Sequence, residues 1–176
     1  MEKKFIMNLK IRFLTSLLAL FSFCFSQQKV DSFFLYDFND KSFYFSEELK
    51  KNKPIFINFF ATWCGPCLQE LPHVQKLADA NPEISFFIIH VDNLYQDNIK
   101  LKEPSRNDVL KTLRNRKITL NNSNILYDKY AIVADKFNII TLPKSYLLSS
   151  SGEIINTYEM IDIKILNDIQ MEIDNL

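Results

Sequence analysis

The chain has few glycine, histidine, tryptophan and cysteine residues. Of its 176 residues only two are glycine, two are histidine, one is tryptophan and three are cysteine. Basic and acidic side chains are equal in number, at 21 each, so the chain has no strong charge of either sign. It also has no internal repeat and no low-complexity tract. The 47% hydrophobic content and the length predict one ordinary globular domain with a full core.

The sequence also lacks a hydrophobic run long enough to span a bilayer, which needs roughly 20 residues. Its most apolar run, Phe13 to Phe25, follows four basic residues and ends near the small residues Cys24 and Ser26. This pattern predicts a secretory signal peptide at residues 1–26, with cleavage after Ser26. A retained anchor and a lipid-modified Cys24 are the alternatives, although Phe23 stands where lipoprotein signals usually carry a small residue.

Cleavage after residue 26 would leave residues 27–176 as one mature domain. The removed segment holds four basic side chains and one acidic, so 17 basic and 20 acidic side chains remain. The resulting net charge of about −3 gives no reason to expect a nucleic-acid partner. Loss of Cys24 also makes Cys64 and Cys67 the only thiols of an exported protein, with no other cysteine to pair with inside the chain.

Hydrophobic patterns in the mature part predict strands that mostly alternate with helices. Two aromatic-rich runs around residues 39–41 indicate a hairpin, followed by a short helix starting near Ser46. Nearly continuous apolar runs at 55–60 and 84–91 are typical of strands buried on both faces. Further elements are a helix capped by Ser105 and Asp108, a strand near 125–127, a helix near 131–137, a hairpin of 144–148 and 153–158 turned by Gly152, and a last helix capped by Asp162.

This order of elements predicts an α/β fold. The expected architecture is a three-layer α/β/α sandwich with a central mixed sheet and an N-terminal β-hairpin extension. The whole mature part is expected to form it, because no linker long enough to divide residues 27–176 is found.

Two cysteines stand where the strand at 55–60 turns into a helix, in the stretch FATWCGPC. A helix N-terminus lowers the pKa of a thiol, because unpaired N–H groups and the positive end of the helix dipole stabilise the thiolate. We therefore expect Cys64 to be the nucleophile and Cys67, which is more buried, to be the resolving thiol. Gly65 tolerates close backbone approach, and Pro66 suits a first helical turn.

Two other uses of the cysteine pair are considered. A structural zinc site usually needs four ligands, but the chain has no second CxxC and only His73 and His90, each of which fits an ordinary packed or surface histidine. A purely structural disulfide would close a loop too short to give much stabilisation. The pattern favours a reactive dithiol, and Trp63 just before it would offer a flat apolar contact to a substrate chain.

With the strand, the WCGPC motif, the helix and a later proline, the sequence resembles the thioredoxin-like family. Within it, the sequence is similar to the exported TlpA/ResA type of thiol-disulfide oxidoreductase. The resemblance covers nearly the whole mature part and is strongest over FATWCGPC. Pro72 matches the family's helix-kinking proline, and Pro143 matches its cis-proline opposite the CxxC.

The proline loop also bears on substrate binding. A cis bond before Pro143 would leave backbone groups of Leu142 free to pair with an extended substrate. Many relatives carry threonine after this proline, whereas this chain has Lys144. The departure concerns substrate preference more than fold.

The resolving thiol needs a base, and the resemblance implies an unusual one. Cytoplasmic thioredoxins carry a buried aspartate six residues before the first cysteine, where this chain has Asn58, which cannot accept a proton. The TlpA/ResA type is similar to this chain in lacking that aspartate and in carrying a glutamate three residues after the second cysteine, here Glu70. A carboxylate one helical turn from Cys67 is placed to take its proton. A glutamate on the helix surface is the alternative.

The resemblance implies an exported reductant of protein disulfides, in the periplasm or an equivalent space, with no cofactor and no metal. Its implied partners are disulfide-containing client proteins and a membrane-bound electron donor, and we expect a monomer. Gly65-Pro66 resembles the reducing members, but an oxidase or isomerase is the alternative, because the potential depends on how strongly the folded site favours the Cys64 thiolate. A binding module that holds a partner or a haem-maturation client without turnover is the rival from another class.

Overall fold

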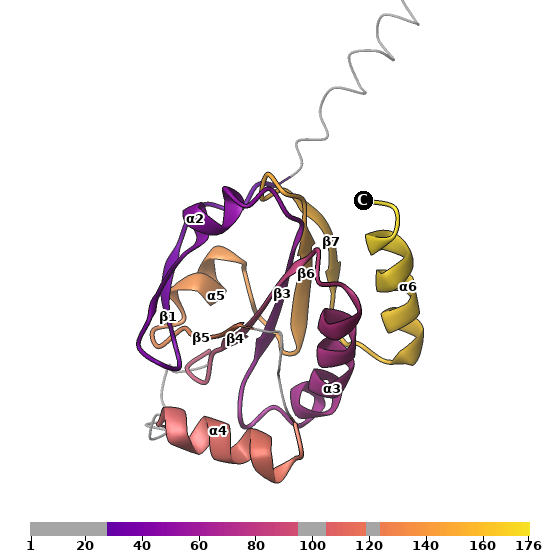
Figure 1. The fold of residues 1–176 in the computed structure, drawn as a ribbon. Helices are drawn as coiled ribbons and strands as arrows, with labels where there is room; N and C mark the ends of the chain where they lie inside the picture. The colour runs from indigo at the N-terminus through magenta and orange to yellow at the C-terminus, as the bar shows by residue number, and fades with distance from the viewer. Residues whose placement is uncertain (1–27, 95–104, 119–123) are drawn as a thin grey trace, which may run out of the picture.

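A seven-stranded mixed sheet forms the middle layer of the protein, in the order β2-β1-β5-β4-β3-β6-β7. The computed structural model describes residues 28–94, 105–118 and 124–176, so the predicted signal peptide lies outside the described residues. Helices α3 and α6 cover one face of the sheet, and α5 lies on the other face (Figure 1). The predicted three-layer α/β/α sandwich is confirmed.

The elements follow the order that the sequence predicts. The strands are β1 (Phe34–Asp37), β2 (Ser42–Tyr44), β3 (Ile55–Phe60), β4 (Ser85–His90), β5 (Asn124–Tyr127), β6 (Lys144–Leu148) and β7 (Ile154–Tyr158). The helices are α2 (Phe45–Leu49), α3 (Gly65–Ala80), α4 (Arg106–Asn115), α5 (Ile132–Lys136) and α6 (Ile163–Ile173). Among the described residues, no helix is long and apolar enough to cross a bilayer.

The centre of the sheet carries the CxxC helix. Strand β3 pairs in parallel with β4 and antiparallel with β6, and β4 pairs in parallel with β5. Every residue of β3 is buried, because its side chains enter two cores. Phe56 and Phe60 pack toward α3, whereas Ile57 and Phe59 pack on the opposite face with Phe137. The continuous apolar run at 55–60 therefore has the two-sided burial that it predicts.

Helix α4 is held by the cap that the sequence indicates. The Ser105 hydroxyl accepts the Asp108 N–H at 3.2 Å, and the Asp108 carboxylate accepts the Ser105 N–H at 3.0 Å. Val109 and Leu113 on its inner side belong to the same core as the two cysteines. Helix α4 thus packs on the sheet face that carries α3, near the end of the sheet where β3 leads into α3 (Figure 1).

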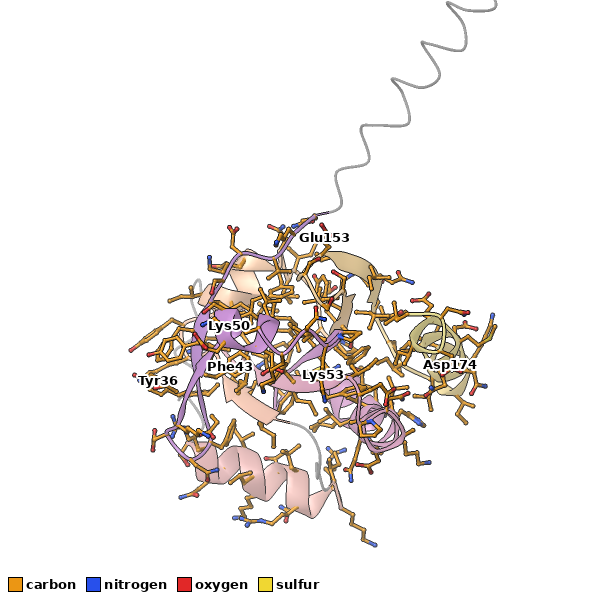
Figure 2. All side chains as sticks on the ribbon, turned by 45° about the horizontal axis from the view of Figure 1, so that its top comes forward. Tyr36, Phe43, Lys50, Lys53, Glu153 and Asp174 are labelled. Carbon is orange, nitrogen blue, oxygen red and sulfur yellow. A yellow bond between two sulfur atoms is a disulfide. The ribbon has the colours of Figure 1, made fainter. Side chains whose placement is uncertain are left out.

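The last hairpin joins the start of the described chain. Gly152 turns β6 into β7 with a φ of 85°, a conformation that side-chain-bearing residues rarely adopt. Glu153 pairs with Lys29 in an isolated antiparallel bridge, and the labelled Glu153 in Figure 2 lies where the described chain begins. This bridge places residues 28–30 along the start of the edge strand β7, far in sequence from their partners.

Candidate active site

Cys64 and Cys67 form a disulfide at the N-terminus of α3, and their Cα atoms are 5.3 Å apart. Cys64 is the N-cap residue, and its Sγ accepts the Cys67 N–H at 3.2 Å. Helix N-termini stabilise negative charge on such a sulfur. Cys64 is 4% exposed and Cys67 is fully buried. Cys64 is therefore the more exposed of the two cysteines, as predicted, but the difference in exposure is small.

Gly65 and Pro66 begin the helix, as expected for a glycine and a proline in its first turn. A Cβ atom added to Gly65 would meet no atom within 4 Å, and its φ is not in the left-handed region. Among the described residues, no atom lies so close to Gly65 that a side chain could not be placed there. The space beside the disulfide is open to another molecule instead.

Glu70 lies one turn after Cys67 and is 1% exposed, so the alternative of a surface glutamate is wrong. Its Oε1 accepts a hydrogen bond from Asn58 Nδ2 at 2.6 Å, and its Oε2 accepts one from the Ile161 N–H at 2.8 Å. Burial raises the pKa of Glu70 to about 7, although both hydrogen bonds act to lower it. This carboxyl group can therefore gain and lose a proton near neutral pH.

Asn58 occupies the place of the missing aspartate and is fully buried on β3. Its amide donates to Glu70 and also to Ser145 Oγ, at 2.9 Å, which links three neighbouring elements. Asn58 Oδ1 has no hydrogen-bond partner among the described residues. The sequence shows that Asn58 is not a base, but it gives no sign that Asn58 holds Glu70.

The peptide bond between Leu142 and Pro143 is cis. Leu142 is partly buried and packs against both cores, on the loop that leads into β6. Within the described part of the chain, its backbone N–H and C=O make no hydrogen bond. Both groups can therefore form hydrogen bonds with the backbone of an extended substrate. Next to the proline, the Lys144 ammonium lies 3.3 Å from Glu159 Oε1.

A second cluster, unforeseen in the sequence, holds the residues just before Cys64. Asp92 follows β4, and its carboxylate accepts the Thr62 N–H at 2.7 Å and the Thr62 hydroxyl at 2.6 Å. The backbone carbonyl of Asp92 accepts the indole N–H of Trp63 at 3.1 Å. Trp63 is nevertheless 45% exposed, so one part of the indole is available to another molecule.

His90 completes this second cluster from inside the protein. Its Nε2 lies 2.8 Å from Asp92 Oδ1, a close polar contact that lacks the alignment of a full hydrogen bond. Burial acts to raise the pKa of Asp92, but His90 and the hydrogen bonds from Thr62 outweigh it and keep the pKa below its usual value. Asp92 is therefore an anion at neutral pH.

No group of three or more histidine, cysteine, aspartate or glutamate side chains among the described residues is arranged to hold a metal ion. His73 lies on α3, and His90 is the last residue of β4. Both cysteine sulfurs are bonded to each other.

Comparison with known proteins agrees with this geometry. Residues 36–103 match the thioredoxin family model, and this segment contains the CxxC pair, Glu70 and Asp92. The chain has a thioredoxin-like fold, and this segment is similar to the thioredoxin family. The chain is 31% identical over 107 residues to sporulation thiol-disulfide oxidoreductase A of Bacillus subtilis (strain 168). It is 30% identical over 110 residues to thiol-disulfide oxidoreductase ResA of Bacillus cereus (strain ATCC 10987 / NRS 248).

These matches cover 61% of this thioredoxin-like chain in both cases, and 59% and 57% of the two relatives. The chain thus spans less than two thirds of the length of these curated relatives. Solved structures share the fold over more of the chain. A protein described as a putative DsbE of Chlorobium tepidum gives a TM-score of 0.68 at 15% identity, over 85% of this chain and 95% of that protein. StoA of Bacillus subtilis gives 0.61 at 22% identity, over 80% and 95%.

Proposed function

We propose that this thioredoxin-like protein is an exported thiol-disulfide oxidoreductase that reduces disulfides of client proteins through Cys64 and Cys67. The main support is the place of Cys64 at the N-cap of α3, within bonding distance of Cys67. The names of the relatives from Bacillus support the same reaction class. The disulfide of the structure corresponds to the oxidised form, which is the product of client reduction.

The reaction begins with the reduced pair. The Cys64 thiolate attacks one sulfur of the client disulfide, forms a mixed disulfide and releases the other client sulfur as a thiolate. Cys67 then loses its proton and attacks the Cys64 sulfur, which re-forms the Cys64–Cys67 bond and releases the second client thiolate. Two electrons pass from the dithiol to the client, and the client thiolates take up protons.

Glu70 is proposed to accept the proton of Cys67. It follows Cys67 by one helical turn, and a pKa of about 7 leaves a large ionised fraction at neutral pH. Asn58 cannot act in this way, because an amide does not accept a proton. Asn58 and the Ile161 N–H instead hold the two oxygens of the carboxylate. The proton returns to solvent before the next cycle.

The client is proposed to lie as an extended segment beside the disulfide. Leu142 offers backbone groups without partners among the described residues, and Trp63 offers an exposed aromatic face. The open space at Gly65 leaves room for the client backbone near Cys64. A membrane-bound electron donor would restore the dithiol after each cycle.

Export forms a separate part of the proposal. The pattern of residues 1–26 supports it, as do relatives of the same fold that are described as a secreted Mycobacterium tuberculosis oxidoreductase and an exposed lipoprotein thioredoxin of Streptococcus pneumoniae. The intact mass of protein recovered from the exporting cell should correspond to residues 27–176. A mass that retains residues 1–26, or a lipid on Cys24, would contradict this part alone.

Trapping of a client tests the reaction and both cysteine roles. Cys67→Ala should accumulate a mixed disulfide between Cys64 and a disulfide-bonded protein such as insulin, because resolution is blocked. Cys64→Ala is the matched control and should accumulate little. Equal trapping by both variants would overturn the assignment. Binding of insulin by the reduced parent without any new insulin thiols would favour the binding module.

A further inference from the structure

Helix α4 and the turn after it carry a cluster of positive charge that the proposed chemistry does not use. Residues 106–117 contain five basic side chains and one acidic side chain, Asp108. Arg106 contacts Asp40 and lies over the ring of Tyr127. The other four basic side chains are exposed and form what we call the α4 basic surface: Lys111, Arg114, Arg116 and Lys117.

The charge of the α4 basic surface is not neutralised by the protein itself. Among the described residues, none of its four side chains forms an ion pair. The nearby carboxylate of Asp108 is engaged in the cap of α4 with Ser105. Lys111 and Arg116 are separated by roughly 8 Å along the helix axis, which is within the Debye length of about 10 Å at 0.1 M salt. An approaching molecule therefore meets one region of positive potential.

Stabilisation of α4 explains only part of this surface. Cations near a helix C-terminus offset the negative end of the helix dipole, which applies to Arg114 in the last turn and to Arg116 at the C-cap. The effect falls off beyond the last turn, so Lys111 gains little from it. Val109 and Leu113, two residues before and after Lys111, are buried, so Lys111 lies on the solvent side of the helix.

The α4 basic surface lies beside the disulfide. Val109 and Leu113 of α4 belong to the core that contains Cys64 and Cys67. Figure 1 and Figure 2 both show the C-terminal end of α4 next to the start of α3, where Cys64 is the N-cap. A client disulfide that reaches Cys64 therefore enters the field of these cations.

The rest of the predicted mature part has an excess of negative charge. After residue 26 the chain has 17 basic and 20 acidic side chains, and four of the basic ones are in the α4 basic surface. The surface is thus a local feature and not one part of a generally basic protein. A local positive region near a reactive sulfur fits a partner that carries negative charge near its own reacting group.

We propose that the α4 basic surface is a docking surface for acidic residues beside the disulfide of a client protein. It adds the charge of the preferred client to the proposed function, on which it rests for the thiol-disulfide exchange at Cys64. Complementary charge raises the rate of encounter between two proteins more than it strengthens the final complex. The preference should therefore appear in kcat/KM, and it should weaken as salt screens the surface.

Disulfide-bonded peptides that differ only in charge measure this preference. Three peptides of one sequence carry glutamate, glutamine or lysine beside the cysteines, and their rates with dithiothreitol correct for the intrinsic reactivity of each disulfide. At about 10 mM salt, the reduced parent should have a kcat/KM for the glutamate peptide about tenfold above that for the glutamine peptide. The lysine peptide should be slower than both. At about 1 M salt, where the Debye length is about 3 Å, the three values should agree within about twofold.

Substitutions in α4 should remove the preference in proportion to the charge that they remove. Lys111→Gln/Arg114→Gln should reduce it from about tenfold to about threefold, and Lys111→Glu/Arg114→Glu should abolish it. Lys111→Arg/Arg114→Lys keeps both charges and should retain the preference. Lys29→Gln/Lys53→Gln is the matched control and should also retain it, because Lys53 precedes β3 and Lys29 lies at the start of β7, at the end of the sheet away from Cys64.

The outcomes separate this inference from the proposed reaction. Equal kcat/KM for the glutamate and glutamine peptides would overturn the docking surface while the reaction stands, as would a preference that Lys29→Gln/Lys53→Gln loses as fully as the α4 variants. Binding to vesicles rich in phosphatidylglycerol, without a preference among the peptides, would assign the surface to a membrane and overturn the inference.

Two further results remain decisive. If the parent reduces none of the peptides, the proposed function fails, and NMR shifts of the α4 amides on addition of the glutamate peptide then show whether the surface binds acidic segments. If Lys111→Gln/Arg114→Gln does not fold, the salt dependence of the parent's preference decides, because a preference that persists at about 1 M salt would not come from charge.

Discussion

Two buried carboxylates stand on the two sides of the CxxC motif, and their surroundings shift their pKa values in opposite directions. Glu70 follows Cys67 and is held by two neutral donors, so burial dominates and its pKa rises to about 7. Asp92 contacts Thr62 before Cys64 and also has His90 beside it, so its pKa falls below the usual value. Similar burial therefore yields a carboxyl group that exchanges a proton and another that stays charged.

The difference suggests a division of labour around one disulfide. A carboxylate that must take up a proton needs surroundings that do not oppose its neutral form. A carboxylate that must hold a turn needs donors that keep it charged, because an ionised acceptor makes stronger hydrogen bonds. Glu70 and Asp92 meet these two requirements, and the variants below separate them.

The largest expected effect is on the pH dependence of stability. The folded pKa of Glu70, about 7, exceeds its unfolded value of 4.5, so its contribution is fully present below 4.5 and is lost as pH rises toward 7. The shift corresponds to about 3 kcal/mol. Urea unfolding between pH 4 and 8 should show that Glu70→Gln removes this loss. Identical pH profiles for variant and parent would contradict the assignment.

Asp92 should give the opposite slope in the same experiment. Its folded pKa is lowered, so its contribution is present above the usual value of 3.8 and is lost as pH falls through the lower folded value. Asp92→Asn should therefore lose stability at neutral pH and approach the parent in acid. A variant that converges with the parent at pH 8 instead would remove the contrast between the two carboxylates.

The next effect is on the rate of resolution. Glu70→Gln should slow the release of the mixed disulfide by about 10²-fold, the usual size of a general-base step. The variant should still fold, because Asn58 Oδ1 lacks a partner among the described residues and the amide can turn to accept from glutamine. Stopped-flow measurement of thiol release, across pH, checks this. A parent-like rate and pH profile would mean that the proton goes to water.

A smaller effect, on the free energy of unfolding, is expected from a substitution of Asn58, which donates a hydrogen bond to Glu70. Asn58→Leu removes the amide donor at similar size, so the unfolding free energy at pH 8 should fall by about 1.5 kcal/mol. The pKa of Glu70 should rise further, since the hydrogen bond from Asn58 acts to lower it. Ser145→Ala, which removes the other acceptor of the same amide, is the control and should leave the titration of Glu70 near that of the parent.

The smallest effect is expected on stability, from a substitution of Gly65, which lies in the CxxC motif between the two carboxylates. A Cβ there meets no atom within 4 Å, so Gly65→Ala should be tolerated and should stabilise α3 by about 0.5 kcal/mol. Thermal unfolding of the oxidised protein provides the measurement. Clear destabilisation would show that the space at Gly65 is needed by the fold itself, and not only by a client.

The order of strands and helices was predictable from the sequence because each element has a local signal. The continuous apolar run of β3, the Ser105 and Asp108 cap of α4 and the glycine of the last hairpin all act within a few residues. The CxxC pair and the buried carboxylate one turn later follow from helical spacing and from the resemblance to the family. These features need no knowledge of which strands are neighbours.

The remaining parts of the site depend on contacts between distant segments. Ile161 donates to Glu70 across 91 residues of sequence, and Asp92 meets Thr62 only because β3 and β4 are adjacent and in register. A histidine in an apolar strand predicts burial, but not a polar partner two residues later. Such pairings are set by strand order and register, which composition and periodicity do not specify.

The titration of the two carboxyl groups is the most direct test of the contrast between them. Carbon-13 NMR of the side-chain carboxyls, assigned with Glu70→Gln and Asp92→Asn, should show Glu70 titrating near pH 7 and Asp92 titrating below its usual value of 3.8. This result would support proton exchange at Glu70 and a permanent charge at Asp92. A Glu70 titration near 4.5, or one that coincides with that of Asp92, would contradict the account.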